Sequence, residues 1–446
     1  MRDLSTIELP QEVIDELPGG EDPSDRILAS IAQALVDKRS QAIAFRTASG
    51  IEETWELCEE AYIGIDDMNR EEYNQGKWIK PPTMQGPVRT NQGSKTVQGG
   101  DPRSTAFVRL TGRYVDAGKA KISEILFQLE DKPFSFSPDP VVILEEGQKD
   151  HSPIVEQGRA LTRPASVTEV PSTTASPTPS DVPLTTSDLA NERLDRLKSS
   201  AEKAENRVYG WMLQAQHHRE MRKVIFDAAR LGVGVVKGPY PTHRRKLSVV
   251  KGPDGVPTVN IEQELIPTHA WRDPWNIFPD PACGENVRDG DYLFEREYFS
   301  EKQLRQLKGL PGYLDAQIDK ALALGPNTGA RTGKNPNERD TRHQYEVWHY
   351  HGTLKRSELA VLNPKAAQDV PKETELVYVV ATMVGAITIR GTLTPLQSGE
   401  IPYHSIPWQR RSGYWAGMGV GEQIFVPQRI VNAATRAVLN NGGVSA

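Results

Sequence analysis

Cysteine is nearly absent from this chain of 446 residues, which contains only two thiols, Cys58 and Cys283. Two widely separated cysteines without a CxxC motif exclude a disulfide framework and a cysteine-based zinc site. We therefore expect a protein of a reducing compartment, in which both thiols are small buried apolar residues without reactivity.

Long apolar runs are also missing. No stretch approaches the roughly 18 consecutive apolar residues that cross a membrane. The N-terminal segment MRDLSTIELPQEVIDELPGG alternates in charge and has no apolar core, which excludes a signal peptide. These absences predict a soluble protein with no membrane partner.

An excess of basic charge is lacking too. The chain has 53 Lys and Arg against 59 Asp and Glu, which gives a formal net charge of −6. A tight, sequence-reading nucleic-acid binder normally has a basic excess on its binding domain, so this class of protein is disfavoured. Loose and transient contact with nucleic acid stays compatible with the charge.

Motifs for catalysis are missing as well, since the chain has no GxSxG and no HExxH. The segment GARTGKN departs from a P-loop, because Thr328 stands where the first glycine is needed and Asn335 where serine or threonine is needed. His349 and His351 alternate along a predicted strand and share a face, but without a third ligand nearby a structural pair is favoured over a metal site. We predict no enzyme, no metal and no cofactor.

Two other polar groups lead to the same conclusion. His217 and His218 are adjacent on a predicted helix and point in different directions, so they do not form a site. The carboxylates of GIDDMNREE lack the spacing of an EF-hand, and a solvated helix end is favoured over a cation site.

Residue patterns divide the chain into six regions. The clearest break is rich in Pro, Ser and Thr, has no aromatic residue and cannot offset its ordering entropy by burial, which predicts disorder. Helical periodicity surrounds it, and β-branched runs with Gly-Pro and Asp-Gly turns follow. The regions are an N-terminal arm (1–23), a helical region with an extended basic loop at 77–103 (24–162), the disordered linker (163–190), a long helix (191–231), a β-rich region (232–415) and a further helix (416–446).

These patterns predict an α+β fold with long helices and strands gathered in one half. Segments with apolar residues at helical spacing are expected to form helices, and Gly64 is expected to end the second helix. The expected helices cover 24–48, 52–64, 104–129, 191–231, 300–310 and the residues from about Glu422 onward. The clearest expected strands lie within 344–356 and 375–396.

An aromatic-proline corner is the most distinctive local feature. In HAWRDPWNIFPDPACG, the large rings of Trp271, Trp275 and Phe278 are interleaved with three prolines, whose fixed backbone angles present the rings rigidly. Two roles are equally compatible with this pattern. The corner is either a plug of the local core or a contact between subunits.

Several segments, taken in order, resemble the portal (head-to-tail connector) proteins of short-tailed double-stranded DNA phages. Among them are DPWNIFPDPACGENVRDGDYLFERE and the C-terminal segment that ends in RIVNAATRAVLNNGG. Each segment is modest alone, and their order and spacing make the match specific. The resembling segments are 61–82, 101–126, 219–241, 273–297 and 401–443.

This resemblance implies a non-enzymatic subunit of a ring, usually dodecameric, at one capsid vertex. Double-stranded DNA passes through such rings without sequence preference during packaging and ejection. Terminase and then tail or adaptor proteins dock on the ring, which also contacts capsid or scaffold protein. The resemblance thus implies a virion protein that assembles in the host cytoplasm.

The resemblance also implies an outer wing built from the helical and β-rich regions, and a stem helix that lines the channel. The stem would begin near Gly417 and Gly419 and continue through Gln428, Asn432 and Arg436, which we take as channel or subunit-interface candidates. Portals continue into a clip, a returning stem helix and a crown, so we expect this sequence to be a fragment or a truncated product. The alternative is another virion structural protein, such as a tail adaptor or an internal capsid protein.

Overall fold

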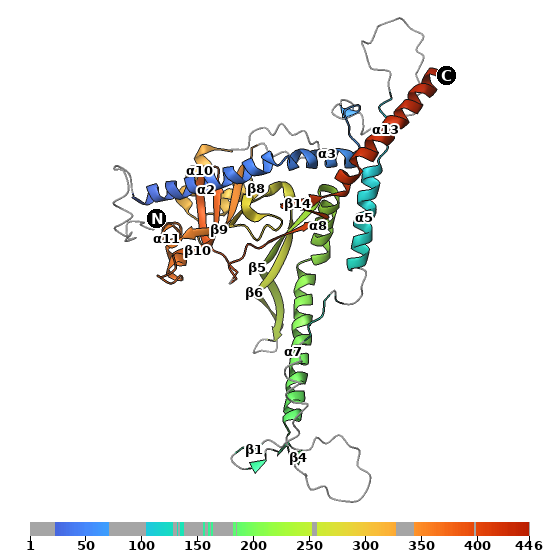
Figure 1. Ribbon diagram of the computed structural model, residues 1–446. Helices are drawn as coiled ribbons and strands as arrows, with labels where there is room; N and C mark the ends of the chain where they lie inside the picture. The colour runs from blue at the N-terminus through green and yellow to red at the C-terminus, as the bar shows by residue number, and fades with distance from the viewer. Residues whose placement is uncertain are drawn as a thin grey trace, which may run out of the picture. The chain divides into compact units, whose positions relative to one another are not determined.

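The computed structural model describes residues 23–70, 104–127, 185–251, 257–326, 343–396 and 398–445, with short pieces between 132 and 183. The chain forms two compact units, unit 1 (Met1–Ile125 with His217–Ala446) and unit 2 (Leu126–Gln216). The basic loop at 77–103, nearly all of the N-terminal arm and most of the 163–190 linker lie outside the described residues. The predicted mixture of helices and sheets is confirmed (Figure 1).

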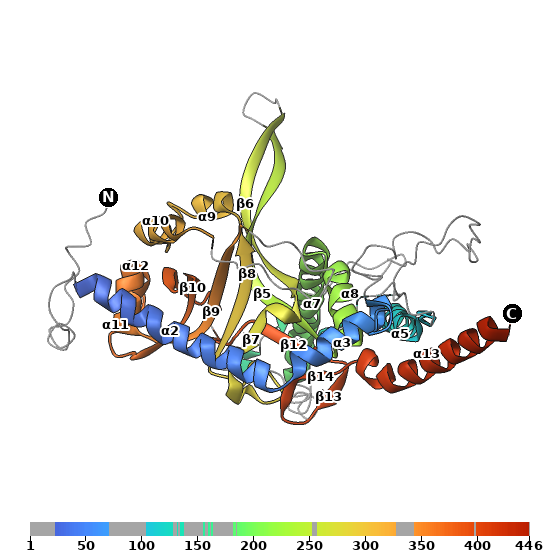
Figure 2. The same ribbon diagram turned by 90° about the horizontal axis from the view of Figure 1, so that it is seen from above.

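Two antiparallel sheets and a separate hairpin form the β-rich part of unit 1. The strands are β5 (Val233–Lys251), β6 (Pro257–Arg272), β7 (Ile277–Pro279), β8 (Tyr292–Phe299), β9 (Tyr345–Lys355), β10 (Leu376–Val384), β11 (Ile387–Leu393), β12 (Tyr403–Pro407), β13 (Gln409–Arg411) and β14 (Tyr414–Met418). The larger sheet has the order β11-β10-β9-β8-β7, the smaller has the order β12-β5-β6, and β13 pairs with β14. β5 and β6 extend beyond the smaller sheet as a long ribbon (Figure 2).

Helices of unit 1 pack against both the larger and the smaller sheet. The helices are α2 (Pro23–Ala48), α3 (Ile51–Ile63), α5 (Leu110–Phe127), α7 (Thr186–Gln214), α8 (His217–Leu231), α9 (Glu301–Gln306), α10 (Asp315–Leu324), α11 (Arg356–Leu362), α12 (Pro364–Gln368) and α13 (Val420–Ser445), with the 3-10 turns η3 (Pro274–Asn276) and η4 (Pro281–Cys283). Unit 2 contains α7 and four two-residue strands, β1 (Val155–Glu156), β2 (Arg159–Ala160), β3 (Thr162–Arg163) and β4 (Val182–Pro183). In the part of the chain that the structure describes, no helix is both long enough and apolar enough to cross a membrane.

The first two helices confirm the sequence pattern. α2 lies across the larger sheet, where Leu28, Ile31 and Leu35 pack into the main core (Figure 2). The chain breaks at Gly50, whose φ is 68°, and α3 ends at Gly64, whose φ is 101°. Both angles lie in the left-handed region that glycine adopts without a side-chain clash.

Two predicted helix boundaries are wrong. The helix expected over 104–129 begins at Leu110, because residues 104–109 are extended. The helix expected over 191–231 begins earlier, at Thr186, within the predicted linker, because Thr185 and Asp188 form a capping box there. It is also two helices, α7 and α8, separated at Gln216, whose φ of 54° cannot continue a right-handed helix. This break coincides with the boundary between the two units.

Both cysteines are buried, as predicted. Cys58 is 2% exposed and Cys283 is 3% exposed. Burial raises the pKa of each thiol to about 12, so both stay protonated at neutral pH.

A buried carboxylate joins the two sheets of unit 1. Glu295 on β8 is 1% exposed and pairs with Lys237 of β5 at 2.6 Å and with Arg272 of β6. Burial opposes its ionisation, but the charges of Lys237 and Arg272 outweigh burial and lower the pKa of Glu295. The Tyr403 hydroxyl of β12 donates its one hydrogen to the same carboxylate. The Tyr403 hydroxyl oxygen therefore accepts from Nε2 of His351 on β9 at 3.2 Å.

The two histidines of β9 have separate partners. His349 contacts Thr382 at 3.1 Å through Nδ1 and Glu297 at 3.3 Å through Nε2, whereas His351 contacts Tyr403. Burial lowers the pKa of His351 well below its ordinary value, so this imidazole is neutral at pH 7. No three His, Cys, Asp or Glu side chains within the described ranges are grouped to hold a metal ion.

A third histidine contact, which the sequence did not reveal, lies at the start of α8. His217 Nδ1 is 2.8 Å from His269 Nε2 of β6. One ring must accept the hydrogen bond, so the contact cannot persist when both are protonated. Burial and the neighbouring His269 lower the pKa of His217 to about 4, and burial lowers the pKa of His269.

We expect acid to weaken unit 1 through this pair. Because the folded-state pKa of His217 lies below its unfolded value of about 6.5, the unfolded state binds more protons as the pH falls. The stability present above about pH 6.5 is therefore lost as the pH falls toward 4. Urea-unfolding midpoints should decline more steeply with acid in the wild type than in a His217→Gln variant.

Comparing the wild type with His217→Gln separates the effect of His217 from that of groups whose pKa is shifted in the opposite direction. Burial raises the pKa of Asp227 to about 7, which favours folding at low pH, but this carboxyl titrates alike in the wild type and the variant. Equal acid slopes for the two proteins would therefore contradict a role for His217.

Candidate subunit-contact site

The aromatic-proline corner is built from two Asp-Pro turns. Asp273 begins η3 and accepts from the Trp275 backbone N–H at 3.1 Å. Asp280 begins η4 in the same way and accepts from Ala282 N at 3.0 Å. In each turn the aspartate caps the first N–H groups and the proline at the next position supplies the required φ. The local sequence alone therefore determines the path of this backbone.

Both tryptophans of the corner donate to buried carboxylates. Trp271 Nε1 donates to Asp227 of α8 at 2.6 Å, and Trp275 Nε1 donates to Glu59 of α3 at 3.1 Å. Arg230 lies between the two acids, 3.1 Å from Asp227 and 3.4 Å from Glu59. The corner thus ties α3 and α8 together inside unit 1.

Phe278 lies in the core of unit 1 and is 2% exposed. Its ring centroid is 5.0 Å from that of Trp348, and the guanidinium groups of Arg46 and Arg296 lie 3.6 and 5.2 Å from it. Burial lowers the pKa of Arg46 to about 10, against the opposing charge of Glu52. The Phe278 ring therefore offers no surface to a second subunit.

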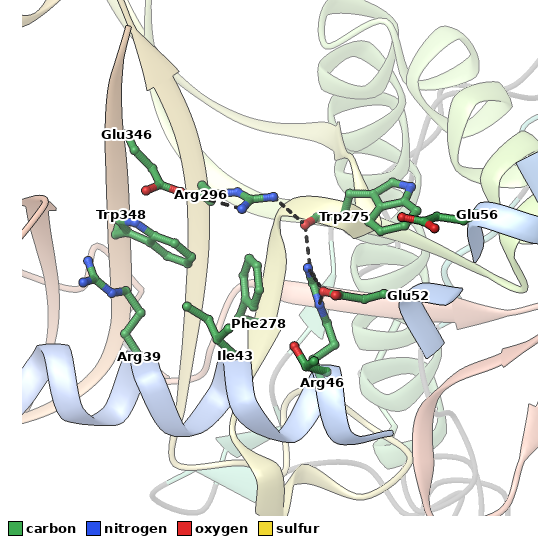
Figure 3. A pocket seen from close by; sticks show the side chains of 11 residues that line it. Arg39, Ile43, Arg46, Glu52, Glu56, Trp275, Phe278, Arg296, Glu346 and Trp348 are labelled. Atoms are coloured by element: carbon green, nitrogen blue, oxygen red, sulfur yellow. Dashed lines mark hydrogen bonds and ion pairs between the residues drawn. The ribbon is translucent and has the colours of Figure 1, made fainter. Parts of the chain in front are cut away.

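A pocket of about 370 Å³ lies beside the Phe278 ring (Figure 3). Arg46 and Arg296 converge there and both donate to the Trp275 carbonyl. The lining residues are Arg39, Ile43, Arg46, Thr47, Glu52, Glu56, Trp275, Phe278, Arg296, Glu346 and Trp348. Three arginines balance three glutamates, and two of the three aromatic rings are buried, so the lining favours no single class of ligand.

Of the two roles that the sequence left open, the structure shows the corner acting as local core. Trp271, Trp275 and Phe278 all contact residues of their own unit. Trp271 and Trp275 keep part of their surface exposed. A subunit contact therefore stays a prediction for the exposed edges of these two indoles.

Gly417 and Gly419 are required by a close crossing of backbones. A Cβ at Gly417 would lie 2.3 Å from the Gln409 carbonyl oxygen, and one at Gly419 would lie 2.6 Å from Gly232 N. Gly232 has a φ of 98°, and its own Cβ would lie 2.4 Å from the Gly417 carbonyl oxygen. Both candidate glycines are buried, so the structure assigns them to packing between β5, β14 and α13.

One face of α13 holds the extended segment 104–109. The residues of this face, the polar stripe, are Gln428, Asn432, Arg436 and Asn440, which are spaced by four and therefore lie on one side of the helix. Their contacts with the segment include Asn432 Oδ1 with Val108 N (2.9 Å), Arg436 Nε with the Ala106 carbonyl (2.9 Å) and Asn440 Oδ1 with Ser104 N (2.7 Å). The polar stripe thus provides hydrogen bonds that a neighbouring strand would otherwise supply.

Gln428 also caps α5. Its Oε1 accepts from Leu110 N and Thr111 N at 3.0 Å each, and from the Thr111 hydroxyl at 3.2 Å. These are the first N–H groups of α5, which have no partner within the helix itself. This contact explains why the predicted helix begins at Leu110 rather than at 104. Gln428 and Asn432 are 2% and 3% exposed, so neither candidate faces solvent.

The opposite face of α13 is apolar and exposed. The residues of this apolar stripe are Val426, Ile430, Ala434 and Val438. They are offset by two positions from the polar stripe, which places them about 200° around the helix. Val426 and Ile430 are each 63% exposed and Val438 is 71% exposed. Unit 1 therefore leaves one side of a long helix uncovered by described residues.

Replacing Gln428 by alanine is expected to loosen the α13–α5 contact. The change removes the acceptor of two backbone N–H groups and one hydroxyl in a buried place, which costs about 1–3 kcal/mol. Hydrogen exchange at Leu110 and Thr111 should speed up, and the free energy of urea unfolding should fall. Gln423→Ala, at an exposed position of the same helix, should change that energy by less than about 0.5 kcal/mol.

The candidates from the resemblance that lie on α13, namely Gln428, Asn432 and Arg436, thus belong to the face that packs against the chain's own segment 104–109 and the start of α5. The exposed face was not singled out, although its signal was visible as apolar residues spaced by four between polar ones. The sequence could not tell which of the two faces meets the rest of the chain, because the partner segment lies more than three hundred residues away.

Comparisons with known proteins identify no relative. No family model matches the chain, and no curated protein matches it.

Proposed function

We propose that this chain is a subunit of a phage portal ring. Copies would assemble in the host cytoplasm and form a ring at one capsid vertex of the virion, and double-stranded DNA would pass through the ring without sequence preference. Terminase, then tail or adaptor proteins, would dock on the ring, and capsid or scaffold protein would surround it. The ordered resemblance of five segments motivates this proposal.

The observation that carries the proposal is the two-sided character of α13. The polar stripe anchors the helix to its own chain through Gln428, Asn432 and Arg436. The apolar stripe leaves Val426, Ile430 and Val438 more than 60% exposed. Burying such a side chain contributes about 1.5–3 kcal/mol, so contact with a neighbouring subunit would stabilise an assembly strongly.

The charge of the chain is compatible with a conduit for DNA. Each lysine or arginine bound to phosphate must release it when the duplex moves, so a conduit gains nothing from a strong basic excess. The net charge of −6 and the neutral apolar stripe agree with loose contact.

The mass of the purified chain in solution tests the proposal. Light scattering on a sizing column, with negative-stain images of the main peak, should reveal closed rings, and the resemblance favours twelve copies. A chain that stays monomeric at concentrations of about 10⁻⁵ M, well above the dissociation constant of a stable oligomer, would contradict ring formation by this chain.

A paired substitution tests the helix face itself. Val426→Asp with Ile430→Asp places two charges on the apolar stripe and should convert rings to monomers without changing the far-ultraviolet circular dichroism. Leu324→Asp, at a 79% exposed position of α10, is the matched control and should leave the rings intact. Rings that survive the paired substitution would exclude the apolar stripe as a subunit contact.

A further inference from the structure

The ribbon of β5 and β6 carries an exposed apolar and basic face. Antiparallel pairing places Leu247 opposite Ile261, Arg245 opposite Gln263 and His243 opposite Leu265. Alternate residues of a strand share a side, so these six side chains form one surface, which we name the ribbon face. Its apolar members, Leu247, Ile261 and Leu265, are 70%, 62% and 57% exposed. An apolar surface of this kind on a projecting ribbon marks a contact site.

The outer side of α3 has the complementary character. This helix contains five glutamates and no basic residue. Glu53 and Leu57 are spaced by four and are both exposed, so they share the outer side of the helix, which we name the acidic ridge. Glu56 is half-buried and lines the pocket beside Phe278 instead. Leu57 is 44% exposed. Within the described ranges, no ion pair involves Glu53 of the acidic ridge or Arg245 of the ribbon face.

The two surfaces cannot meet within one chain. Both belong to unit 1, and the two views show the ribbon projecting away from the side on which α3 lies (Figures 1 and 2). Two different complementary surfaces on opposite sides of a body produce a head-to-tail contact between copies, which closes into a ring when the rotation allows it.

We infer that the ribbon face of one copy docks on the acidic ridge of the next. The occupant of the ribbon face is thus the α3 helix of a second copy, with Arg245 against Glu53 and with Leu57 against the apolar side chains. This inference rests on the proposed ring and names a contact separate from the apolar stripe of α13. Opposite charges around an apolar centre set the register of such a contact and suppress wrong pairings.

A charge exchange tests the contact in the full chain. Arg245→Glu places a carboxylate against the acidic ridge, and Glu53→Arg places a guanidinium against the ribbon face. Each change should raise the chain concentration needed for half-assembly about tenfold or more, measured by light scattering. The double variant Arg245→Glu/Glu53→Arg restores opposite charges and should recover assembly.

Matched controls separate this effect from net charge and misfolding. Lys372→Glu and Glu373→Arg make the same charge changes at exposed positions before β10 and should assemble like the wild type. All variants should keep the wild-type circular dichroism and urea midpoint, since none of the four substituted residues belongs to the buried core.

The possible outcomes distinguish this contact from the ring itself. If the wild type forms rings that the paired α13 substitution disrupts and Arg245→Glu does not, the ring stands and this contact is wrong. Single variants that weaken assembly without rescue in the double variant would also overturn the pairing of Arg245 with Glu53. A wild type that never assembles would overturn both.

Discussion

Adding one methyl group at Gly419 is expected to unfold the junction from which α13 emerges. A Cβ at this position would lie 2.6 Å from Gly232 N, 2.9 Å from the Arg230 carbonyl oxygen and 3.1 Å from the Ala229 carbonyl oxygen. All three neighbours are backbone atoms, which cannot rotate aside as a flexible side chain can. We expect Gly419→Ala to lower the free energy of unfolding of unit 1 by more than about 3 kcal/mol, the range of severe steric and core defects.

A glycine in open surroundings provides the control for this prediction. Gly210 in α7 has no atom within 4 Å of an added Cβ. Gly210→Ala should therefore stabilise its helix by about 0.5–1 kcal/mol, because alanine loses less conformational entropy on folding. Urea unfolding followed by tryptophan fluorescence measures both, and a Gly419→Ala variant as stable as the wild type would contradict the close crossing.

Removing the carboxylate of Glu295 is expected to have an effect of similar size. Glu295→Ala leaves Lys237 and Arg272 without the anion between them and leaves the Tyr403 hydroxyl without its acceptor. Breaking a buried ion pair by deleting one partner typically costs about 3–5 kcal/mol, because the remaining charge stays desolvated. The cooperative unfolding transition of unit 1 should shift to lower urea concentration by a corresponding amount.

Two comparisons make this prediction specific to burial. Glu301→Ala removes one member of an exposed pair with Arg305 and should change stability by less than about 1 kcal/mol. Glu295→Gln keeps the shape and an acceptor oxygen but removes the charge, so it should fall between the alanine variant and the wild type. If Glu295→Ala and Glu301→Ala had equal effects, the buried cluster would not join the two sheets.

Local features of unit 1 followed from short stretches of sequence. The helix at Pro23–Ala48, the break at Gly50 and the stop at Gly64 depend on apolar spacing and on glycine's access to positive φ. The strands β9 and β10 and the short helix α9 lie within the segments that were expected to form strands and a short helix. Such signals act over a few residues and need no knowledge of the rest of the chain.

The wrong predictions of helices concern residues that contact segments distant in the sequence. Residues 104–109 have a helical pattern, yet Asn432 and Asn440 hold their backbone extended. The predicted 191–231 helix breaks at Gln216. His217, which the sequence assigned to no site, contacts His269, fifty-two positions away along the chain. Propensity is a weak preference, and hydrogen bonds from tertiary partners override it.

The sequence by itself determined the mixed fold class, the burial of both cysteines and the Asp-Pro turns of the aromatic corner, because each depends on composition or on neighbours along the chain. Only the tertiary structure decided which face of α13 is exposed. Gln428 is buried against the start of α5 and Asn432 against the segment before it, whereas Val426 and Ile430 are exposed, since the buried face of a two-sided helix depends on what packs against it.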